Sequence, residues 1–444
     1  MSKITFYASE YATLDSDVKA GGGTDDTKAI QQLLDKALEH PLHLVMDGAA
    51  LVGGLVFHSN TTIECLNQSC GFYLKDHVSV PLLQNSNQNF YEIKTENVCL
   101  YGGTYNFNCL HQEHHRQPEG HAFDDNSIDD FVNCWTFGFR IYGIKNLVIR
   151  DVTTIDQRTF TMMIANFENV TMDNIDIQLP NILFGQNQDG LHFWGPGRFL
   201  TLTNIKGTSG DDIIALAPDE GDSKSSITDV LIDGLMLKEA DQAIRLLSRG
   251  KGRLDRVVIR NVSGEFKSFG FFINPWFRGD GIEGNIGHIT FENIDLTQKN
   301  HKYTYSSPLL FRLGGTIERL TFKNIRFSNP DDKAVFMQIG GSYSDEHKSD
   351  DGCPSRIGTV LIDGLEIVKN EDGNPTRGIE VKCPVETLII RDAFLNNFDE
   401  QSFITMFEKG EIAHLSIDGV CINDKNKLID DAAEKVKSLH TRVI

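Results

Sequence analysis

The sequence predicts an all-β protein, a single right-handed parallel β-helix with an N-terminal capping helix. Three observations support this prediction: a ten-residue phrase that recurs along the chain, turn residues inside every copy of it, and one amphipathic helix before the first copy. We expect one domain over residues 1–444, with the cap at about 20–40, the coils at about 42–422 and a closing segment at about 423–444.

The capping helix follows a glycine-rich turn at Gly21–Gly23. From Lys28 to Glu39 apolar residues recur at helical spacing, so the helix has one face to bury. Either Thr24 or Asp25 is placed to accept hydrogen bonds from its first N–H groups. A solenoid needs such a cap, because its first coil otherwise exposes an apolar core and unpaired backbone groups.

Short strands interrupted by turn residues follow at 42–57 and 61–74, and then the repeated phrase takes over. Each copy is a short alternating strand, then Asn or Asp with a neighbouring Gly or Asn, then another short strand. The spacing of 23 to 40 residues leaves no room for a helix in each repeat and favours coils of a parallel β-helix with loops of variable length. The ten copies begin at residues 145, 168, 198, 228, 255, 287, 318, 358, 386 and 413.

Three segments depart from the repeat. Residues 108–131 and 341–354 are rich in His and Asp, and are either metal-binding loops or solvated rims. We predict no metal site and no cofactor. Apolar residues at helical spacing in Asp430–Leu439 predict a short closing helix.

Composition excludes several classes of function. The net charge of −20 argues against nucleic acid and anionic membranes as partners. The chain has no apolar run of transmembrane length and no signal-peptide core, so we expect a cytoplasmic protein, or a secreted one whose signal has been removed. The eight cysteines show no zinc-ligand spacing, and we interpret most of them as small buried hydrophobes. Nothing in the sequence indicates an oligomeric state.

Three carboxylates form the candidate catalytic site. Asp189 lies in Asn187-Gln188-Asp189-Gly190, and Asp211 and Asp212 follow Gly210. The 22 residues between 189 and 211 correspond to about one coil, which stacks these boxes on neighbouring coils. Crowded carboxylates cannot all ionise independently, so a proton donor stands beside proton acceptors, as glycoside hydrolysis requires. The alternative is turn chemistry alone, for which adjacent aspartates are not needed.

These motifs resemble those of a known family. The segment from Gly23 to Ile30 resembles the opening of pectate-lyase-like β-helix proteins, and the Asn187–Gly190 box resembles the NTDG box of glycoside hydrolase family 28, the polygalacturonases, with Gln in place of Thr. Gly210-Asp211-Asp212 resembles that family's second aspartate box. The resemblance, over about residues 20–300, implies an inverting hydrolase with Asp211 as general acid, while Asp189 and Asp212 hold and deprotonate water.

The resemblance fails where that family recognises its sugar. Gln242 stands where the family has His, and the strand from Gly270 to Trp276 lacks the Arg and Lys that grip a uronate. An acidic sugar is therefore not implied. Our candidate substrate-binding residues are Asn187, His192, Trp194, Gln242, Arg245, Asn274 and Trp276.

Several of these candidates have a structural alternative. Trp194 and Trp276 either stack on sugar or pack in the core. Arg245 points either inward or outward, and is either a ligand or a structural residue. It heads a locally basic segment that either neutralises an acidic sugar or forms a solvated rim, namely Arg245, Arg249, Lys251, Arg253 and Arg256.

The sequence therefore favours a glycosidase that acts on an oligo- or polysaccharide of pectin-like or other plant or microbial origin. Two alternatives stay open: a polysaccharide lyase or epimerase on the same scaffold, and a non-catalytic carbohydrate-binding or tailspike-like protein.

Overall fold

The computed structural model describes residues 3–87, 91–114, 135–183, 185, 187–222, 224–274, 283–304, 306–329, 334–341, 355–368, 376–396, 402–422, 427–430 and 434–443. The chain divides into two compact units, Met1–Ala215 and Leu216–Ile444. In each unit, strands of successive coils pair in parallel, which confirms the predicted all-β parallel β-helix.

The first unit contains all the helices that the structure describes, together with strands of 3 to 17 residues. Its elements are β1 (Ile4–Tyr7), η1 (Ala8–Glu10), α1 (Thr27–Leu34), η2 (Asp35–Leu38), β2 (Leu42–Met46), β3 (Ala49–Val52), β4 (Leu55–Phe57), β5 (Thr61–Cys65), β6 (Gly71–Leu74), β7 (Leu83–Asn85), β8 (Thr95–Tyr101), β9 (Thr104–Asn106), η3 (Cys109–His111), β10 (Phe139–Arg150), β11 (Thr153–Ile155), β12 (Met162–Gln178) and β13 (Leu191–Gly207).

Strand β14 (Asp212–Ala217) runs across the division, and the second unit consists of strands. They are β15 (Ile227–Leu247), β16 (Leu254–Asn274), β17 (Ile286–Gln298), β18 (Leu309–Leu313), β19 (Thr316–Ser328), β20 (Val335–Ile339), β21 (Arg356–Ile367), β22 (Arg377–Val381), β23 (Pro384–Leu395), β24 (Ser402–Met406), β25 (Glu411–Ile422), β26 (Lys427–Asp430) and β27 (Val436–Val443).

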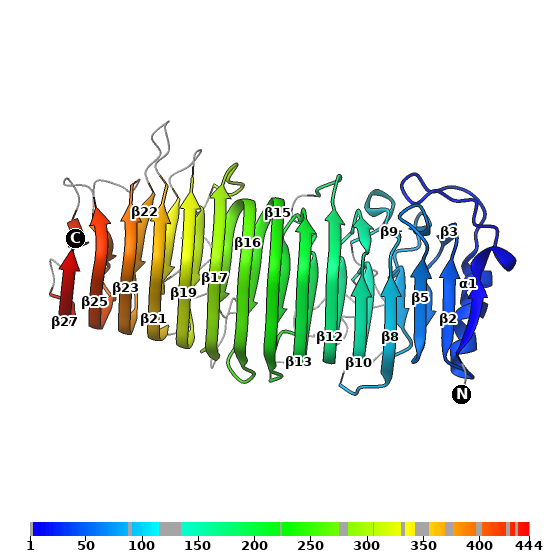
Figure 1. Ribbon diagram of the computed structural model, residues 1–444, viewed down its shortest axis with the longest axis horizontal. Helices are drawn as coiled ribbons and strands as arrows, with labels where there is room; N and C mark the ends of the chain where they lie inside the picture. The colour runs from blue at the N-terminus through cyan, green and yellow to red at the C-terminus, as the bar shows by residue number, and fades with distance from the viewer. Residues whose placement is uncertain are drawn as a thin grey trace, which may run out of the picture. The chain divides into compact units, whose positions relative to one another are not determined.

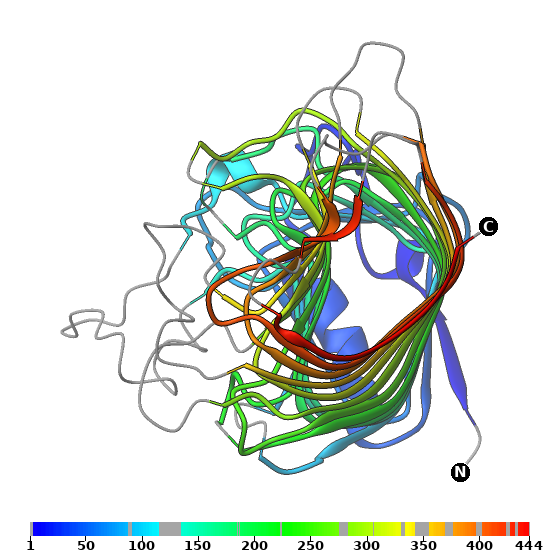
Figure 2. The same ribbon diagram turned by 90° about the vertical axis from the view of Figure 1, so that its left-hand side faces the viewer.

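The predicted capping helix is present, although its last turn is a 3₁₀ helix. Helix α1 buries Ile30, Leu33 and Leu34 and contacts β2, β3 and β4. Figure 1 shows it beside β2, and Figure 2 shows the same strands end-on. Of the two predicted capping residues, Asp25 accepts a hydrogen bond of 3.0 Å from Thr27 N–H, which satisfies one of the first free donors of the helix.

Copies of the repeated phrase stack in register. The first residue of one copy pairs with the first residue of the next: Lys145 with Glu168, and Glu168 with Arg198. Figure 1 shows the strands that carry these copies, β10, β12 and β13, side by side. In the second unit the same holds from the copy at 228 to the copy at 255, and from 318 through 358 and 386 to 413. Loops of variable length thus leave the coil register unchanged.

The seventh residue of every copy is left-handed, with φ between +49° and +84°. This conformation costs most side chains about 1–2 kcal/mol but is tolerated by Gly, Asn and Asp. Where these are Asn, their side chains pair between coils: Asn293 Nδ2 donates to Asn261 Oδ1 at 3.1 Å, and Asn324 Nδ2 to Asn293 Oδ1 at 3.1 Å. The seventh residues, here called the turn ladder, are Asp151, Asn174, Asn204, Gly234, Asn261, Asn293, Asn324, Gly364, Asp392 and Gly419.

Large apolar side chains fill the interior of the coils. In the second unit Phe271 stacks on Phe311 with ring centroids 5.0 Å apart, and Phe291 stacks on Phe322 at the same distance. Of the six described cysteines, four are buried, as predicted, and Cys99 and Cys421 are not. Residues Cys134 and Cys353 lie outside the described residues.

The predicted closing helix at Asp430–Leu439 is wrong. Strand β26 ends at Asp430, and β27 begins at Val436 and pairs in parallel with β25. Val436 and Leu439 pair with Ile412 and Leu415 of β25, so the parallel partner that the preceding coil offers, and not the spacing of apolar residues, decides the structure here.

The turn ladder leads to a stability prediction for Asn293. Asn293→Val places a β-branched residue at φ +55° and removes hydrogen bonds to both neighbouring coils, whereas Asn293→Gly keeps the backbone unstrained. We expect the valine variant to lose about 2–3 kcal/mol of unfolding free energy and the glycine variant about 1 kcal/mol or less. Urea unfolding followed by circular dichroism tests this, and equal losses would contradict a backbone origin.

Candidate active site

The two aspartate boxes are neighbours in the first unit. Gly190 N–H donates to Asp212 O at 2.8 Å, and Gly210 N–H donates to Gln188 O at 3.0 Å. These hydrogen bonds join the two segments on both sides of Asp189. The 22-residue separation is therefore one coil, as predicted from the sequence.

The two hydrogen bonds enclose the aspartate pair: by the parallel pairing rule Gly210 is opposite Asp189 and Ile213 is opposite Gly190, so Asp211 and Asp212 lie between these two positions. Met162 N–H bonds to Gly190 O where Met162 pairs with Leu191, so by the same rule Gly190 is opposite Ile213. A Cβ on Gly190 would lie 2.3 Å from Ile213 O, which explains the glycine at this position. Strand spacing then separates the Asp189 segment from the Asp211-Asp212 segment by about 4.8 Å.

The three aspartates differ in exposure. Asp189 is 3% exposed and Asp212 is 6% exposed, whereas Asp211 is half-buried. The Asp211 main chain is fixed by Ser209, whose Oγ donates to Asp211 O at 2.7 Å. The arrangement thus brings two buried carboxyl groups and a more accessible one to adjacent positions, which is the inventory that acid/base cleavage of a glycosidic bond requires.

Asn187 and Gln188 support this geometry in different ways. Asn187 is exposed and left-handed, with φ +49°, so it serves as a turn residue. Gln188 is fully buried and holds the preceding loop: its Oε1 accepts from Leu183 N–H at 2.5 Å, and its Nε2 donates to Gln157 O at 2.7 Å and Asn181 O at 3.2 Å. The glutamine that departs from the family box therefore has a structural function in this chain.

Gln157 completes a reciprocal arrangement with Gln188. Its Nε2 lies 3.4 Å from Gln188 O and 3.3 Å from Asp189 O, so the side chain of each glutamine bonds to the main chain of the other. Both residues are fully buried. Sequence analysis missed Gln157 because no motif around it indicates a contact with a residue 31 positions away.

His192 contacts Asp189 directly. Its Nδ1 lies 2.8 Å from Asp189 Oδ2, and its ring stacks on Phe160 at 4.1 Å with an interplanar angle of 5°. This packing fixes the orientation of the imidazole and of the carboxylate that it meets. The predicted alternation is confirmed, since Leu191 and Phe193 lie in the core and His192 lies on the other face with Trp194.

An aromatic cluster surrounds this histidine. Trp194 meets the His192 ring edge-on at 6.1 Å, and Phe160 also contacts Trp135 at 5.1 Å and Phe137 at 5.3 Å. Trp194 is buried, which favours packing over an open sugar platform, while Trp135 is half-buried. Sequence analysis missed Phe160, although an aromatic residue before a predicted strand offered a weak signal.

The remaining predicted binding residues lie in the second unit. Arg245 lies on the face opposite the core residues Ile244 and Leu246, which settles its orientation. Its guanidinium carbon lies 4.2 Å from the centre of the Phe272 ring, and its Nη1 donates to Asn274 Oδ1 at 3.3 Å. Gln242 and Asn274 are also buried, and Trp276 lies outside the described residues.

Next to Gln242 is a buried carboxylate that sequence analysis missed. Asp241 Oδ2 accepts hydrogen bonds from Lys302 Nζ at 3.0 Å and Tyr303 Oη at 2.9 Å, and its Oδ1 accepts from Ser268 Oγ at 2.9 Å. These partners come from β16 and from the loop after β17, so no local sequence pattern connects them. Their effect is to fix that loop against β15.

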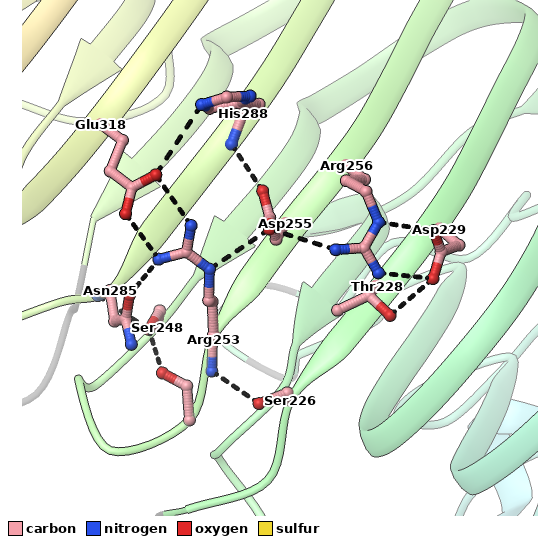
Figure 3. A network of polar contacts seen from close by, with 11 residues as sticks. Ser226, Thr228, Asp229, Ser248, Arg253, Asp255, Arg256, Asn285, His288 and Glu318 are labelled. Atoms are coloured by element: carbon pink, nitrogen blue, oxygen red, sulfur yellow. Dashed lines mark hydrogen bonds and ion pairs between the residues drawn. The ribbon is translucent and has the colours of Figure 1, made fainter.

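Two arginines of the basic segment after Arg245, Arg253 and Arg256, belong to a network of ion pairs, shown in Figure 3. Arg253 forms two hydrogen bonds of 2.9 Å with Glu318, and Arg256 bonds to Asp229 at 2.6 and 2.8 Å. Both arginines also lie 3.3 Å from Asp255 Oδ2. Of the two interpretations of this segment, a rim bound by its own carboxylates fits better than a receptor for an acidic sugar.

The network spans the first residues of three successive copies, Asp255, Gly287 and Glu318, of which only the two acids form ion pairs. A Cβ on Gly287 would lie 2.0 Å from Asp255 Oδ1 and 2.6 Å from Arg253 Nη2. The missing side chain therefore leaves the space in which Arg253 reaches Glu318, two coils beyond Asp255.

The other candidate sites from the sequence are the two segments rich in His and Asp. Residues 115–134 and 342–354, which hold most of the two His- and Asp-rich segments, lie outside the described residues. Elsewhere in the described chain, no group of three metal-binding side chains is found. Among the helices described, none has the length and apolar character needed to cross a membrane.

Comparison with known proteins finds sequence similarity to polygalacturonases. No family model matches the chain. It is 29% identical to an exopolygalacturonase of Platanus acerifolia over 111 residues, 24% of this chain and 28% of that protein. It is 28% identical to an exopolygalacturonase of Oenothera organensis over 226 residues, 47% of this chain and 57% of that protein. The match thus covers 28% to 57% of the length of these curated relatives, and the chain resembles polygalacturonases, as its aspartate boxes indicate.

Solved structures agree on the fold. The family 28 exopolygalacturonase of Yersinia enterocolitica aligns with a TM-score of 0.54 at 13% identity, covering 100% of this chain and 78% of that one. The surface adhesin PfbA of Streptococcus pneumoniae aligns with a TM-score of 0.53 at 16% identity, covering 96% of this chain and 92% of that one. At these identities the likeness shows a shared fold and no shared activity.

The contacts of Gln188 lead to a prediction for the loop before Asp189. Gln188→Thr restores the family residue but removes the buried hydrogen bonds to Leu183, Gln157 and Asn181. We expect a loss of about 2–4 kcal/mol of unfolding free energy and faster hydrogen exchange at the Leu183 amide. Gln178→Thr, at an exposed position on β12, is the control. Unchanged exchange in Gln188→Thr would mean that this side chain does not hold the loop.

The ion-pair network leads to a prediction about pH. Hydrogen bonds from Arg253 hold the pKa of Glu318 below its ordinary value of 4.5. A lowered pKa stabilises the fold above pH 4.5, and this contribution is lost as the pH falls through the lowered value. Because Glu318 is half exposed, we expect Glu318→Gln to cost less than about 1 kcal/mol at neutral pH.

The measurement compares urea midpoints of wild type and Glu318→Gln from about pH 7 to about pH 3. We expect the difference to shrink towards acid. The control is Glu386→Gln, an exposed first residue of a later copy on β23, which should show no such trend. A difference that persists at low pH would show that the Glu318 charge is not its source.

Proposed function

We propose that this protein is a glycoside hydrolase that cleaves a glycosidic bond in an oligo- or polysaccharide with inversion at the anomeric carbon. The observation that carries the proposal is the position of Asp189 beside the Asp211-Asp212 segment on the next coil. The names of the curated relatives, exopolygalacturonase and polygalacturonase, support a pectin-like galacturonan as the substrate.

The three aspartates have two different roles, general acid and general base. Asp211, the most accessible, is the general acid that protonates the glycosidic oxygen as the bond to the anomeric carbon breaks. Asp189 and Asp212 hold a water molecule and take its proton as its oxygen attacks the opposite face of that carbon. The leaving sugar departs as an alcohol, and the new hemiacetal has inverted configuration. His192, fixed by Phe160, orients the Asp189 carboxylate for this step.

A second candidate is a carbohydrate-binding protein without turnover. It is supported by the similar fold of a bacterial surface adhesin, which aligns about as well as the exopolygalacturonase does. A β-eliminating lyase or an epimerase on the same fold is a third candidate, and its product distinguishes it from a hydrolase.

The test is hydrolysis of a panel of galacturonan oligosaccharides, neutral plant-wall oligosaccharides and aryl glycosides, with the anomer of the first product identified by NMR. We expect an inverted product, and we expect Asp211→Asn to lower kcat by about 10²–10⁴-fold with an unchanged circular dichroism spectrum. Asp295→Asn, at an exposed site in the second unit, serves as control.

Each other outcome favours a different function. An unsaturated uronate product would indicate a lyase, and a changed sugar configuration without chain cleavage would indicate an epimerase. Sugar binding that is never followed by turnover would support the adhesin-like alternative. Near-full activity of Asp211→Asn would show that another group is the acid.

A further inference from the structure

An exposed phenylalanine interrupts a row of polar residues on the first unit. The second residue of every repeated phrase is polar, except in the copy that begins at Arg198, where it is Phe199. Phe199 is 45% exposed, and its backbone is left-handed, with φ +62°. Asn146 and Asn169, at the same place in the two preceding copies, have φ +59° and suit this conformation, whereas a bulky aromatic residue is strained by it.

The asparagines before Phe199 form a hydrogen-bonded row across neighbouring coils. Asn146 Nδ2 donates to Asn97 Oδ1 at 2.9 Å, and Asn169 Nδ2 donates to Asn146 Oδ1 at 3.1 Å. Their strands, β8, β10 and β12, lie side by side with β13 in Figure 1, and the register sets Phe199 opposite Asn169. An asparagine at 199 would extend this row by one amide. With Phe199 there, the last acceptor of the row, Asn169 Oδ1, has an aromatic residue opposite it instead of a donor.

Charged residues next to this row hold the ring and balance one another. The Arg198 guanidinium carbon lies 4.5 Å from the centre of the Phe199 ring, so it covers one face of the ring. Nitrogens of Arg198 and Lys145 lie 3.9 and 3.2 Å from Glu168 Oε1, and Glu96 is opposite Lys145. The two bases and two acids at these first positions therefore leave no surplus charge around the exposed ring.

A ring of this kind is suited to bind sugar. Strained backbone conformations cluster at functional sites. A planar apolar ring packs against the C–H face of a pyranose, and an amide oxygen such as Asn169 Oδ1 accepts a hydrogen bond from a hydroxyl group. One exposed ring is too small for a stable protein interface, which buries about 800 Å² on each partner. The balanced charge favours a neutral sugar over a uronate.

We propose that Phe199 and Asn169 form a second carbohydrate-binding site, which takes neutral sugar units of a polysaccharide by stacking on the ring. Phe199 lies seven residues beyond His192 on β13, so this site is separate from the candidate active site. It holds a polymer on the surface of the protein and contacts no bond that is cleaved. Binding here does not depend on hydrolysis, because none of the three aspartates takes part in it.

The first experiment is affinity gel electrophoresis in gels that contain a neutral galactan, a xyloglucan or polygalacturonate. Every variant carries Asp211→Asn, so that no polymer is degraded. We expect the neutral polymers to retard Asp211→Asn, and the addition of Phe199→Asn to weaken that binding about 10-fold. Phe199→Tyr keeps a ring and should keep the retardation. Phe394→Asn, at a 57% exposed phenylalanine of the second unit, is the matched control and should change nothing.

The second experiment is urea unfolding of the same variants. We expect Phe199→Asn to raise the urea midpoint, because asparagine accepts the left-handed backbone and its Nδ2 can continue the row to Asn169 Oδ1. A gain in stability together with a loss of sugar binding is a result that a purely structural role of Phe199 does not produce.

The proposal is wrong if the neutral polymers retard Phe199→Asn as strongly as its parent, or retard neither. It is equally wrong if Phe199→Asn unfolds at a lower urea concentration, which would mean that the ring supports the fold. Retardation by polygalacturonate that depends on Phe199, with none by the neutral polymers, would contradict the neutral class of sugar. Because hydrolysis is not measured, these outcomes are distinct from a failure of the proposed function.

Discussion

The stacking of coils in this protein depends on one backbone constraint, the left-handed residue at position seven of each repeated phrase. A left-handed residue at a fixed place bends the strand at the same point in every coil, and only a few residue types accept that conformation at low cost. Because all ten copies obey this rule, strands before and after the bend stay in register while the loops between copies vary in length. Other features of the fold, including the placement of the aspartates, follow from that register.

Much of this organisation could be predicted from the sequence because it is local. The repeated phrase, its turn residues and the capping helix can each be recognised within about ten residues of sequence. The stacking of Asp189 beside Asp211 can be predicted from their separation, which equals the length of one coil. The prediction for the closing segment was wrong because it, too, used local spacing alone. Its spacing of apolar residues suits a helix, but the deciding factor is the edge of β25, which lies outside the segment and pairs with β27.

The parts that escaped prediction involve contacts across coils. Gln157 and Gln188 bind each other's main chains, Asp241 gathers partners from two other elements, and Phe160 stacks on His192. None of these contacts has a sequence pattern, because they join loops whose lengths are not repeated. The aspartates were identifiable by residue type and spacing, whereas the residues that hold them were not.

The empty position at Gly287 has a consequence for how this sequence can change. Asp255, Gly287 and Glu318 open three successive copies, and Arg253 crosses the middle one to reach the third. A side chain at 287 would block the arginine, and Asp255 and Glu318 would then lose the cation that they share. Among descendants of this chain, these positions are therefore expected to vary together, so that neighbouring repeats, although alike in backbone, are not interchangeable in order.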